Sequence, residues 1–268
     1  MGFAQVVCLS IINAVLSIFG TCMTISLIVT IYQNSELQKG LNLLIVSLTV
    51  ADLANCLIAQ PVYIYYLSNE TSTSYLTAFQ IIAFICLHAV FLNLTTITYH
   101  RMKALARPFH HLLSVSQNSL LVYIGLTWVF SIIAGVTLAT EPGKVAGPYV
   151  HGLMILLLIF TYIRILWVSW KRRRGKILAQ ARTANYNQQV ATMEQENATA
   201  LTSAILVGST LGCFLPDVVL DLMGKGEENR LKWAYTLLFA SSAMNPCVIV
   251  WRNQQFRRTL LRMVHLAK

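Results

Sequence analysis

The sequence predicts an all-α membrane protein, a bundle of seven transmembrane helices followed by a short amphipathic helix. Of its 268 residues, 56% are hydrophobic and only 11% are charged, whereas a soluble domain carries about 25% charged residues. Seven apolar segments are long enough to cross a bilayer, which takes about 20 residues per helix. They occupy residues 6–32, 41–67, 74–99, 119–139, 149–170, 199–223 and 231–251. The alternating pattern of barrel strands is missing, so a helical bundle is the fold that pairs the backbone in lipid.

Positive charge is divided unequally between the two sides of the predicted bundle. Of the 20 lysines and arginines, sixteen fall on the side that carries the C-terminus and four fall on the other. The positive-inside rule therefore predicts a multi-pass protein with an extracellular N-terminus and a cytoplasmic C-terminus. The net charge of +10 indicates topology and attraction to anionic membrane lipid, and we expect no nucleic-acid partner.

The chain divides into the seven-helix domain, residues 1–252, and a cytoplasmic surface helix with its tail, residues 253–268. In the tail, Phe256 and Val264 fall on one helical side and Arg257 falls elsewhere, a pattern typical of a helix that lies along the membrane surface.

Two features concern the predicted outer loops. Asn69-Glu70-Thr71 is an N-glycosylation sequon, so Asn69 is the expected acceptor. All six cysteines lie within the predicted spans and none lies in an outer loop, so we expect no disulfide there.

Four residues within the spans or just beyond their ends are of types that need an explanation. Asp52 lies mid-membrane, which indicates a functional polar site or, alternatively, a hydrogen-bonded structural carboxyl group. Arg101 ends the third span, either as a cytoplasmic anchor or as a switch residue. Pro216 frees a backbone carbonyl and bends the sixth span. Glu196 precedes Pro216 by twenty residues, about 30 Å along a helix, and so reaches the depth of Arg101.

These residues belong to a set of motifs that keep one order across nearly the whole chain. The set is Leu48…Ala51-Asp52-Leu53, Arg101 with Pro108, Trp128, Tyr162, Cys213-Phe214-Leu215-Pro216, and Asn245-Pro246 with Asn253 and Phe256-Arg257. Together they resemble the rhodopsin-like (class A) family of G-protein-coupled receptors. The resemblance implies a plasma-membrane receptor, not an enzyme, which binds an extracellular ligand in the outer half of the bundle. It also implies activation of a heterotrimeric G protein by outward movement of the sixth span.

The resemblance further implies roles for individual residues. Arg101 would hold the inactive state through an ionic contact to Glu196, and Phe214 would stand where the family has a tryptophan switch. The remaining implied switch residues are Tyr162, Pro216, Asn245 and Pro246. Asp52, with Ser242 and Asn245, would form the polar site that binds a sodium ion in many relatives. No other cofactor is expected.

The chain departs from the family pattern at several of these positions. His100 replaces the acidic residue before the arginine, and Ile249 replaces the tyrosine after the seventh-span proline. Met154 stands in place of the fifth-span proline, and the short second outer loop, residues 140–148, has no cysteine. In lacking this proline and this loop cysteine, the chain resembles the melanocortin, lysophospholipid and cannabinoid receptor group. We expect His100 to loosen Arg101 and raise basal activity; the opposite hypothesis is poor coupling, because Ile249 cannot make the tyrosine contact.

The implied ligand pocket includes Ala83, His88, Asp217, Asp221 and Phe239. Ala83 stands where amine receptors carry an aspartate, and Phe239 where opsins carry the retinal lysine, so neither class is expected. Asp217 and Asp221 either provide a counter-charge for a cationic ligand or peptide, or belong to a solvated helix end. A lipid is a further alternative for the ligand. His88 and His151 could face the pocket, but two histidines without a carboxylate cluster do not predict a metal site.

Three other classes of protein remain as alternatives. A non-signalling decoy or chaperone of receptor fold is compatible with the same sequence. A small transporter would need inverted repeats or a chain of mid-membrane acids, and Asp52 stands alone at its depth. An intramembrane enzyme would need clustered carboxylates or metal-spaced histidines, which the sequence does not contain.

Overall fold

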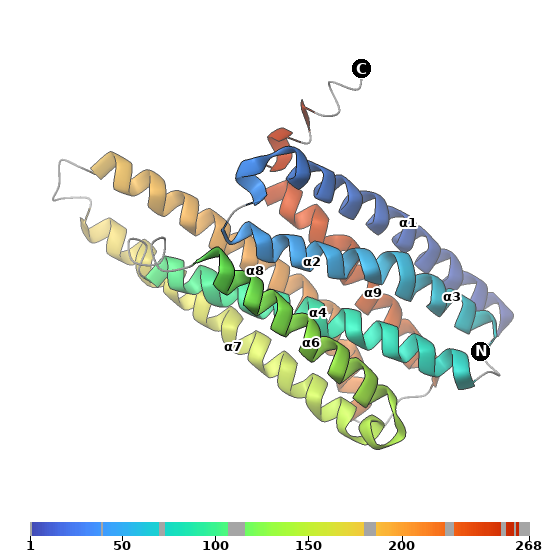
Figure 1. Ribbon diagram of the computed structural model, residues 1–268. Helices are drawn as coiled ribbons and strands as arrows, with labels where there is room; N and C mark the ends of the chain where they lie inside the picture. The colour runs from blue at the N-terminus through green and yellow to red at the C-terminus, as the bar shows by residue number, and fades with distance from the viewer. Residues whose placement is uncertain are drawn as a thin grey trace.

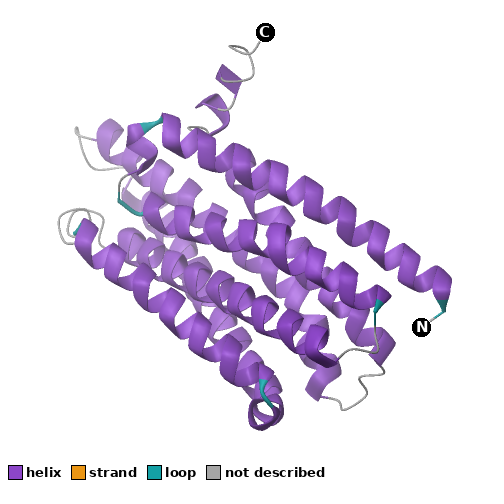
Figure 2. Cartoon of the chain, turned by 45° about the vertical axis from the view of Figure 1, so that its right-hand side comes forward, coloured by secondary structure: helices purple, strands orange, loops and turns teal. Residues whose placement is uncertain are grey.

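The computed structural model describes residues 2–38, 40–69, 73–106, 116–179, 186–222, 228–252, 256–259 and 261–262. These residues form an elongated helical bundle, with the start of α1 and the end of α9 at opposite ends (Figure 1). Its long helices are α1 (Phe3–Gln33), α2 (Asn42–Ala54) continued by η2 (Asn55–Ala59) and α3 (Gln60–Ser68), α4 (Thr73–Ala106), α6 (Gln117–Ala139), α7 (Glu141–Ala179), α8 (Tyr186–Leu222) and α9 (Glu228–Arg252). A short 3-10 turn, η1 (Ser35–Gln38), follows α1. Figure 2 shows that nearly all of the described residues are helical.

Seven segments of the described chain are long and apolar enough to cross a membrane. They are Phe3–Gln33, Asn42–Ser68, Leu76–Lys103, Gln117–Ala139, Val145–Lys171, Leu201–Leu220 and Lys232–Arg252. Each coincides with one of the predicted spans, which confirms the predicted fold class.

The helix α7 extends beyond the predicted fifth span at both ends. The span itself ends at Lys171, where the basic residues 171–174 begin, but the helix continues to Ala179. Lysine and arginine are good helix formers, so the helix can leave the hydrocarbon without unwinding. The predicted outer loop 140–148 is also mostly helical: α7 begins at Glu141, and Thr140 alone separates it from α6.

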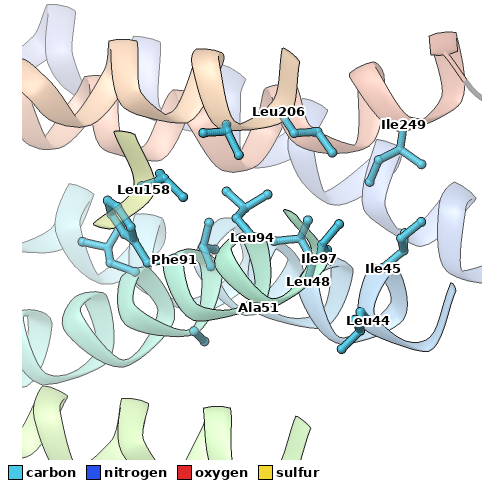
Figure 3. Close-up of a cluster of buried hydrophobic side chains, with 14 of the residues drawn as sticks. Leu44, Ile45, Leu48, Ala51, Phe91, Leu94, Ile97, Leu158, Leu206 and Ile249 are labelled. Carbon is cyan, nitrogen blue, oxygen red and sulfur yellow. The ribbon is translucent and has the colours of Figure 1, made fainter. Parts of the chain in front are cut away.

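The main apolar core lies around α4, the most buried of the seven spans. Phe91, Leu94 and Ile97 of α4 join a cluster of buried side chains from the neighbouring helices (Figure 3). Its other labelled members are Leu44, Ile45, Leu48, Ala51, Leu158, Leu206 and Ile249. By contrast, most of the α1 and α7 span surfaces are not buried, as expected for helices that face lipid.

Two glycines stand where helices approach closely. A Cβ atom on Gly20 of α1 would lie 2.5 Å from Sγ of Cys56 and 3.2 Å from Cβ of Ala243. On Gly135 of α6 it would lie 2.8 Å from the backbone nitrogen of Ile85 in α4. Small residues of this kind let transmembrane helices come together.

The second span contains a π-helical turn, Asn55–Ala59, just before Pro61. Proline has no N–H, and its ring clashes with the carbonyl group four residues earlier in a regular helix. A single wide turn is a local adjustment to such a proline, and such turns often occur at functional sites.

The described part of the tail, residues 256–259 and 261–262, is helical. Phe256 is fully buried in the main core, whereas Arg257 and Arg258 are exposed. Nδ2 of Asn34, after α1, donates a hydrogen bond to Oγ1 of Thr259 at 3.3 Å. The burial is compatible with the predicted amphipathic helix, whose remaining residues lie outside the described part.

Candidate functional site

A polar centre, which we define as Asp52, Asn55, Ser242 and Asn245, lies between the second span and α9. All four residues are fully buried. Nδ2 of Asn245 donates hydrogen bonds to both carboxylate oxygens of Asp52, at 3.1 and 3.2 Å. The side chain of Ser242, one turn earlier in α9, lies close to the Asp52 carboxyl group. The three residues of the sodium-like site that the resemblance implies therefore meet in space.

Asn55 extends this centre from the π-helical turn. Its Nδ2 donates a hydrogen bond to Oγ of Ser242 at 2.8 Å. The amide oxygens of Asn55 and Asn245 are buried and have no hydrogen-bond partner among the described residues. The centre thus offers one carboxylate and two unpaired amide oxygens, and oxygen ligands of this kind suit a hard cation.

Two buried asparagines escaped the sequence analysis. Asn55 follows Asp52 by three residues, so the helical period alone places it on the same face. Asn13 of α1 is fully buried, and its Nδ2 donates to Oγ1 of Thr236 in α9 at 2.9 Å. An asparagine within an apolar span is the signal that could have singled out both residues.

Near the end of α4, Arg101 is partly buried and His100 is buried. The His100 ring lies edge-on to the ring of Tyr123 in α6, with 5.6 Å between their centres. Glu196 lies on α8, but its side chain is outside the described part of the structure. The Arg101–Glu196 contact therefore stays a prediction.

Tyr162 of α7 points toward α8. A Cβ atom on Gly208 would lie 3.7 Å from the Tyr162 hydroxyl oxygen. Ile249, at the family's tyrosine position, is 2% exposed and packs in the main core. It therefore occupies a dry, apolar environment in this arrangement.

Phe214 of α8 meets α4 in the middle of the bundle. Its ring is nearly perpendicular to that of Phe91, with 4.3 Å between ring centres. Pro216 follows two residues later, inside α8. Pro246 is buried and likewise lies inside α9. The predicted bend and the predicted switch side chain are thus neighbours on one helix.

Toward the start of α4 an aromatic cluster fills the space between α3, α4 and α9. Its rings are those of Tyr63, Tyr66, Phe79, Tyr235 and Phe239. Ala83 and Phe239, both assigned to the pocket, are each 1% exposed within it. The Tyr63 hydroxyl group donates to the backbone oxygen of Lys232 at 2.6 Å and so ties α3 to α9.

The remaining predicted residues have different outcomes. The side chains of Asp217 and Asp221, on α8, lie outside the described part, so their role stays a prediction. Asn69 is exposed just after α3, as a glycosylation acceptor must be. All six cysteines lie within described helices, and all are free thiols.

His88 of α4 and His151 of α7 lie side by side, with 5.3 Å between ring centres. His88 is 3% exposed and His151 is partly buried. Their Nε2 atoms are both buried and have no hydrogen-bond partner among the described residues.

Comparison with known proteins agrees with this arrangement. A family model described as 7 transmembrane receptor (rhodopsin family) matches residues 23–148. The adenosine receptor A2b of Gallus gallus is 23% identical and the alignment covers 96% of this chain and 87% of that receptor. The G-protein coupled receptor 39 of Homo sapiens is 20% identical, with 93% and 70% covered. For the D(1C) dopamine receptor of Xenopus laevis the identity is 24%, with 82% and 59% covered.

Solved structures give the same architecture. The crystal structure of squid rhodopsin superposes with a TM-score of 0.84 and covers 100% of this chain and 87% of that chain. The sequence identity is 14%, so this likeness shows the fold.

Proposed function

We propose that this chain is a receptor of the rhodopsin-like (class A) family, which binds an extracellular ligand and activates a heterotrimeric G protein. The matched family model, the similar receptors and the rhodopsin fold support this proposal. The ligand would enter the outer half of the bundle, and the sixth span would swing outward at the cytoplasmic end. In this proposal the N-terminus is extracellular and the C-terminus cytoplasmic, in agreement with the distribution of positive charge.

The observation that carries the proposal is the buried contact between Asp52 and Asn245. The two residues are 193 positions apart, and an ionisable residue at this depth is a functional-site hypothesis by default, because it is expensive to bury in a membrane. Their hydrogen bonds join the second and seventh spans through a polar group that two helix arrangements could pair differently. Such a polar connection suits a bundle with two states, between which a ligand shifts the populations by its differential affinity.

The sixth span contains the parts of a moving element. Pro216 removes one backbone hydrogen bond inside α8 and so weakens the helix locally. Phe214 packs edge-on against Phe91 of the central helix α4. A change at that aromatic contact would move the first half of α8, which contains Glu196, relative to the end of α4, which contains Arg101.

The polar centre also fits a sodium ion. Asp52 would supply the charge, and Ser242 with the amide oxygens of Asn55 and Asn245 would supply neutral ligands. The two unpaired amide oxygens support this fit, because buried acceptors without a partner carry a free-energy cost. A bound ion would favour the arrangement of spans that keeps these oxygens together.

The chemistry of the ligand is proposed more coarsely. Ala83 offers no carboxylate to a simple amine, although one relative is named for dopamine. Tight packing of Ala83 and Phe239 in the aromatic cluster leaves α7 and α8 as the pocket walls that we favour. Asp217 and Asp221 of α8 would suit a cationic ligand or peptide.

Basal nucleotide exchange by a panel of G proteins tests this proposal. The chain is compared with Arg101→Ala and Glu196→Ala at equal surface expression. We expect Glu196→Ala to raise exchange, since it releases Arg101, and Arg101→Ala to abolish it. Silence of all three proteins with every G protein would contradict coupling.

A second candidate, a receptor fold that binds ligand without signalling, is favoured by Ile249. This side chain is buried in the apolar core and cannot offer the hydroxyl group that Tyr162 would meet in an active state. Ile249→Tyr separates the two functions: exchange that appears only in this variant would support the silent receptor.

A further inference from the structure

We infer that His88 and His151 form a binding site for a transition-metal ion, Zn²⁺ or Cu²⁺, between the third and fifth spans. This inference concerns metal binding by the bundle and does not rest on the proposed signalling function. The two residues are 63 positions apart and no carboxylate cluster accompanies them, so the sequence alone does not predict a metal site.

The hydrogen bonding of His88 fixes the position of its free lone pair. Nδ1 of His88 lies 2.5 Å from the backbone oxygen of Phe84, one turn earlier in α4. A carbonyl oxygen can only accept, so Nδ1 carries the proton, and in a neutral ring the lone pair is then on Nε2. Histidines that bind metals characteristically donate their other N–H to a carbonyl or carboxylate group in this way.

Each of the two Nε2 atoms is buried and lacks a hydrogen-bond partner among the described residues. Imidazole nitrogen is the ligand that Zn²⁺ and Cu²⁺ share, whereas Mg²⁺ and Ca²⁺ prefer oxygen. An ion held by both rings would therefore give a partner to both buried nitrogens, provided that the His151 ring is in the tautomer with the lone pair on Nε2.

The distance between the rings matches a tetrahedral metal. A Zn–N bond is about 2.0–2.1 Å, and Nε2 lies about 1.1 Å from the centre of an imidazole ring, so each ring centre would lie about 3.2 Å from the metal. A tetrahedral angle of about 109° then separates the two centres by about 5.2 Å. The separation in this structure is 5.3 Å, with 42° between the ring planes.

The surroundings predict a site with two open positions. Phe84 packs against both imidazoles, with centres 5.3 Å from His151 and 6.3 Å from His88. The described residues contain no third histidine, cysteine, aspartate or glutamate grouped with the pair. Water or a polar group of a ligand would complete the coordination. The competing occupant is a single water molecule that donates to both Nε2 atoms.

The test measures metal binding by the whole chain in nanodiscs. The chain is purified through an affinity tag that contains no histidine, so that the tag adds no metal ligand. Cu²⁺ electron paramagnetic resonance counts nitrogen ligands, and titration with Zn²⁺ follows the midpoint of thermal unfolding. We expect one Cu²⁺ with two nitrogen ligands and a rise of the midpoint with Zn²⁺. Absence of a two-nitrogen signal in the unmodified chain overturns the inference in favour of water, whether or not the chain couples to a G protein.

Variants locate the site. His88→Phe and His151→Phe should each weaken metal binding by about tenfold or more, since loss of a supporting hydrogen bond alone costs 10–100-fold at metal sites. The matched control replaces the other four histidines, His100, His110, His111 and His265, with asparagine and should keep the signal. Unchanged binding in the phenylalanine variants, or its loss in the control, would contradict the assignment. If the phenylalanine variants fail to fold, the four-histidine variant still decides the question.

Discussion

The amide nitrogen of Asn245 lies 3.1 and 3.2 Å from the two carboxylate oxygens of Asp52, and both residues are fully buried. This contact is the main polar link between α2 and α9 in the described structure. Because it is made to a buried carboxyl group, its loss leaves that group poorly satisfied.

Asn245→Ala is therefore expected to lower the free energy of unfolding by about 1–3 kcal/mol, the range for a buried polar group that loses its partner. Thermal unfolding at a fixed heating rate measures the change. Asn93→Ala is the matched control, because Asn93 is also buried but its amide donates only to Ala89 in its own helix. Equal losses in the two variants would mean that the contact with Asp52 adds nothing.

A sodium ion in the polar centre would stabilise the folded chain by mass action. The unfolding midpoint should rise when choline chloride is replaced by NaCl at constant ionic strength. Asp52→Asn should remove this rise, since the variant keeps the shape of the side chain but not its charge. Ser131→Ala should keep it, because Ser131 is buried in α6 and bonds only to Thr127 of the same helix. A sodium response that survives Asp52→Asn would place the ion elsewhere.

The contact between Asp52 and Asn245 was anticipated through the resemblance to the receptor family, whereas the residue type alone indicates only that a carboxyl group in mid-membrane needs some partner. The seven spans were equally predictable, since hydrocarbon thickness fixes the length of each apolar segment. Asn55 was missed for a different reason: an amide is a weak signal until a neighbouring helix supplies Ser242. The π-helical turn was missed too, although Pro61 marked the place where the helix had to adjust.

The apolar pattern predicts where a transmembrane span ends, but it does not predict where the helix ends. The helix α7 continues through the basic residues to Ala179, because those residues favour helix in water. The proximity of His88 and His151 depends on which faces of α4 and α7 pack against each other. The residue pattern of either segment alone does not predict that orientation.

His100→Asp should lower basal nucleotide exchange, because a carboxylate beside Arg101 would hold the arginine in the inactive arrangement. His100→Asn is the control for the size of the side chain and for its packing against Tyr123. Only the aspartate variant should reduce exchange. If both variants behave alike, the loss of the imidazole, and not the added charge, would be responsible.

The edge-on contact between Phe91 and Phe214 is expected to contribute about 0.5–1.5 kcal/mol beyond the burial of the two rings. A double-mutant cycle with Phe91→Leu and Phe214→Leu isolates this term from thermal unfolding. Basal exchange, measured on the same four proteins, should change together in the three variants if the contact restrains α8. Additive effects on unfolding would show that the two rings do not interact energetically.

Gly135 sets the distance between α4 and α6, because a Cβ atom there would lie 2.8 Å from the backbone nitrogen of Ile85. A backbone atom cannot rotate away, so Gly135→Ala must push the two helices apart. We expect a loss of about 1–3 kcal/mol, as for other overpacked interiors. Gly125→Ala is the matched control on the same helix: nothing lies within 4 Å of its Cβ position, and alanine favours helix over glycine. Gly125→Ala should leave the unfolding midpoint unchanged or raise it, while Gly135→Ala lowers it. Equal midpoints for the two variants would mean that α6 does not pack on α4 at this distance.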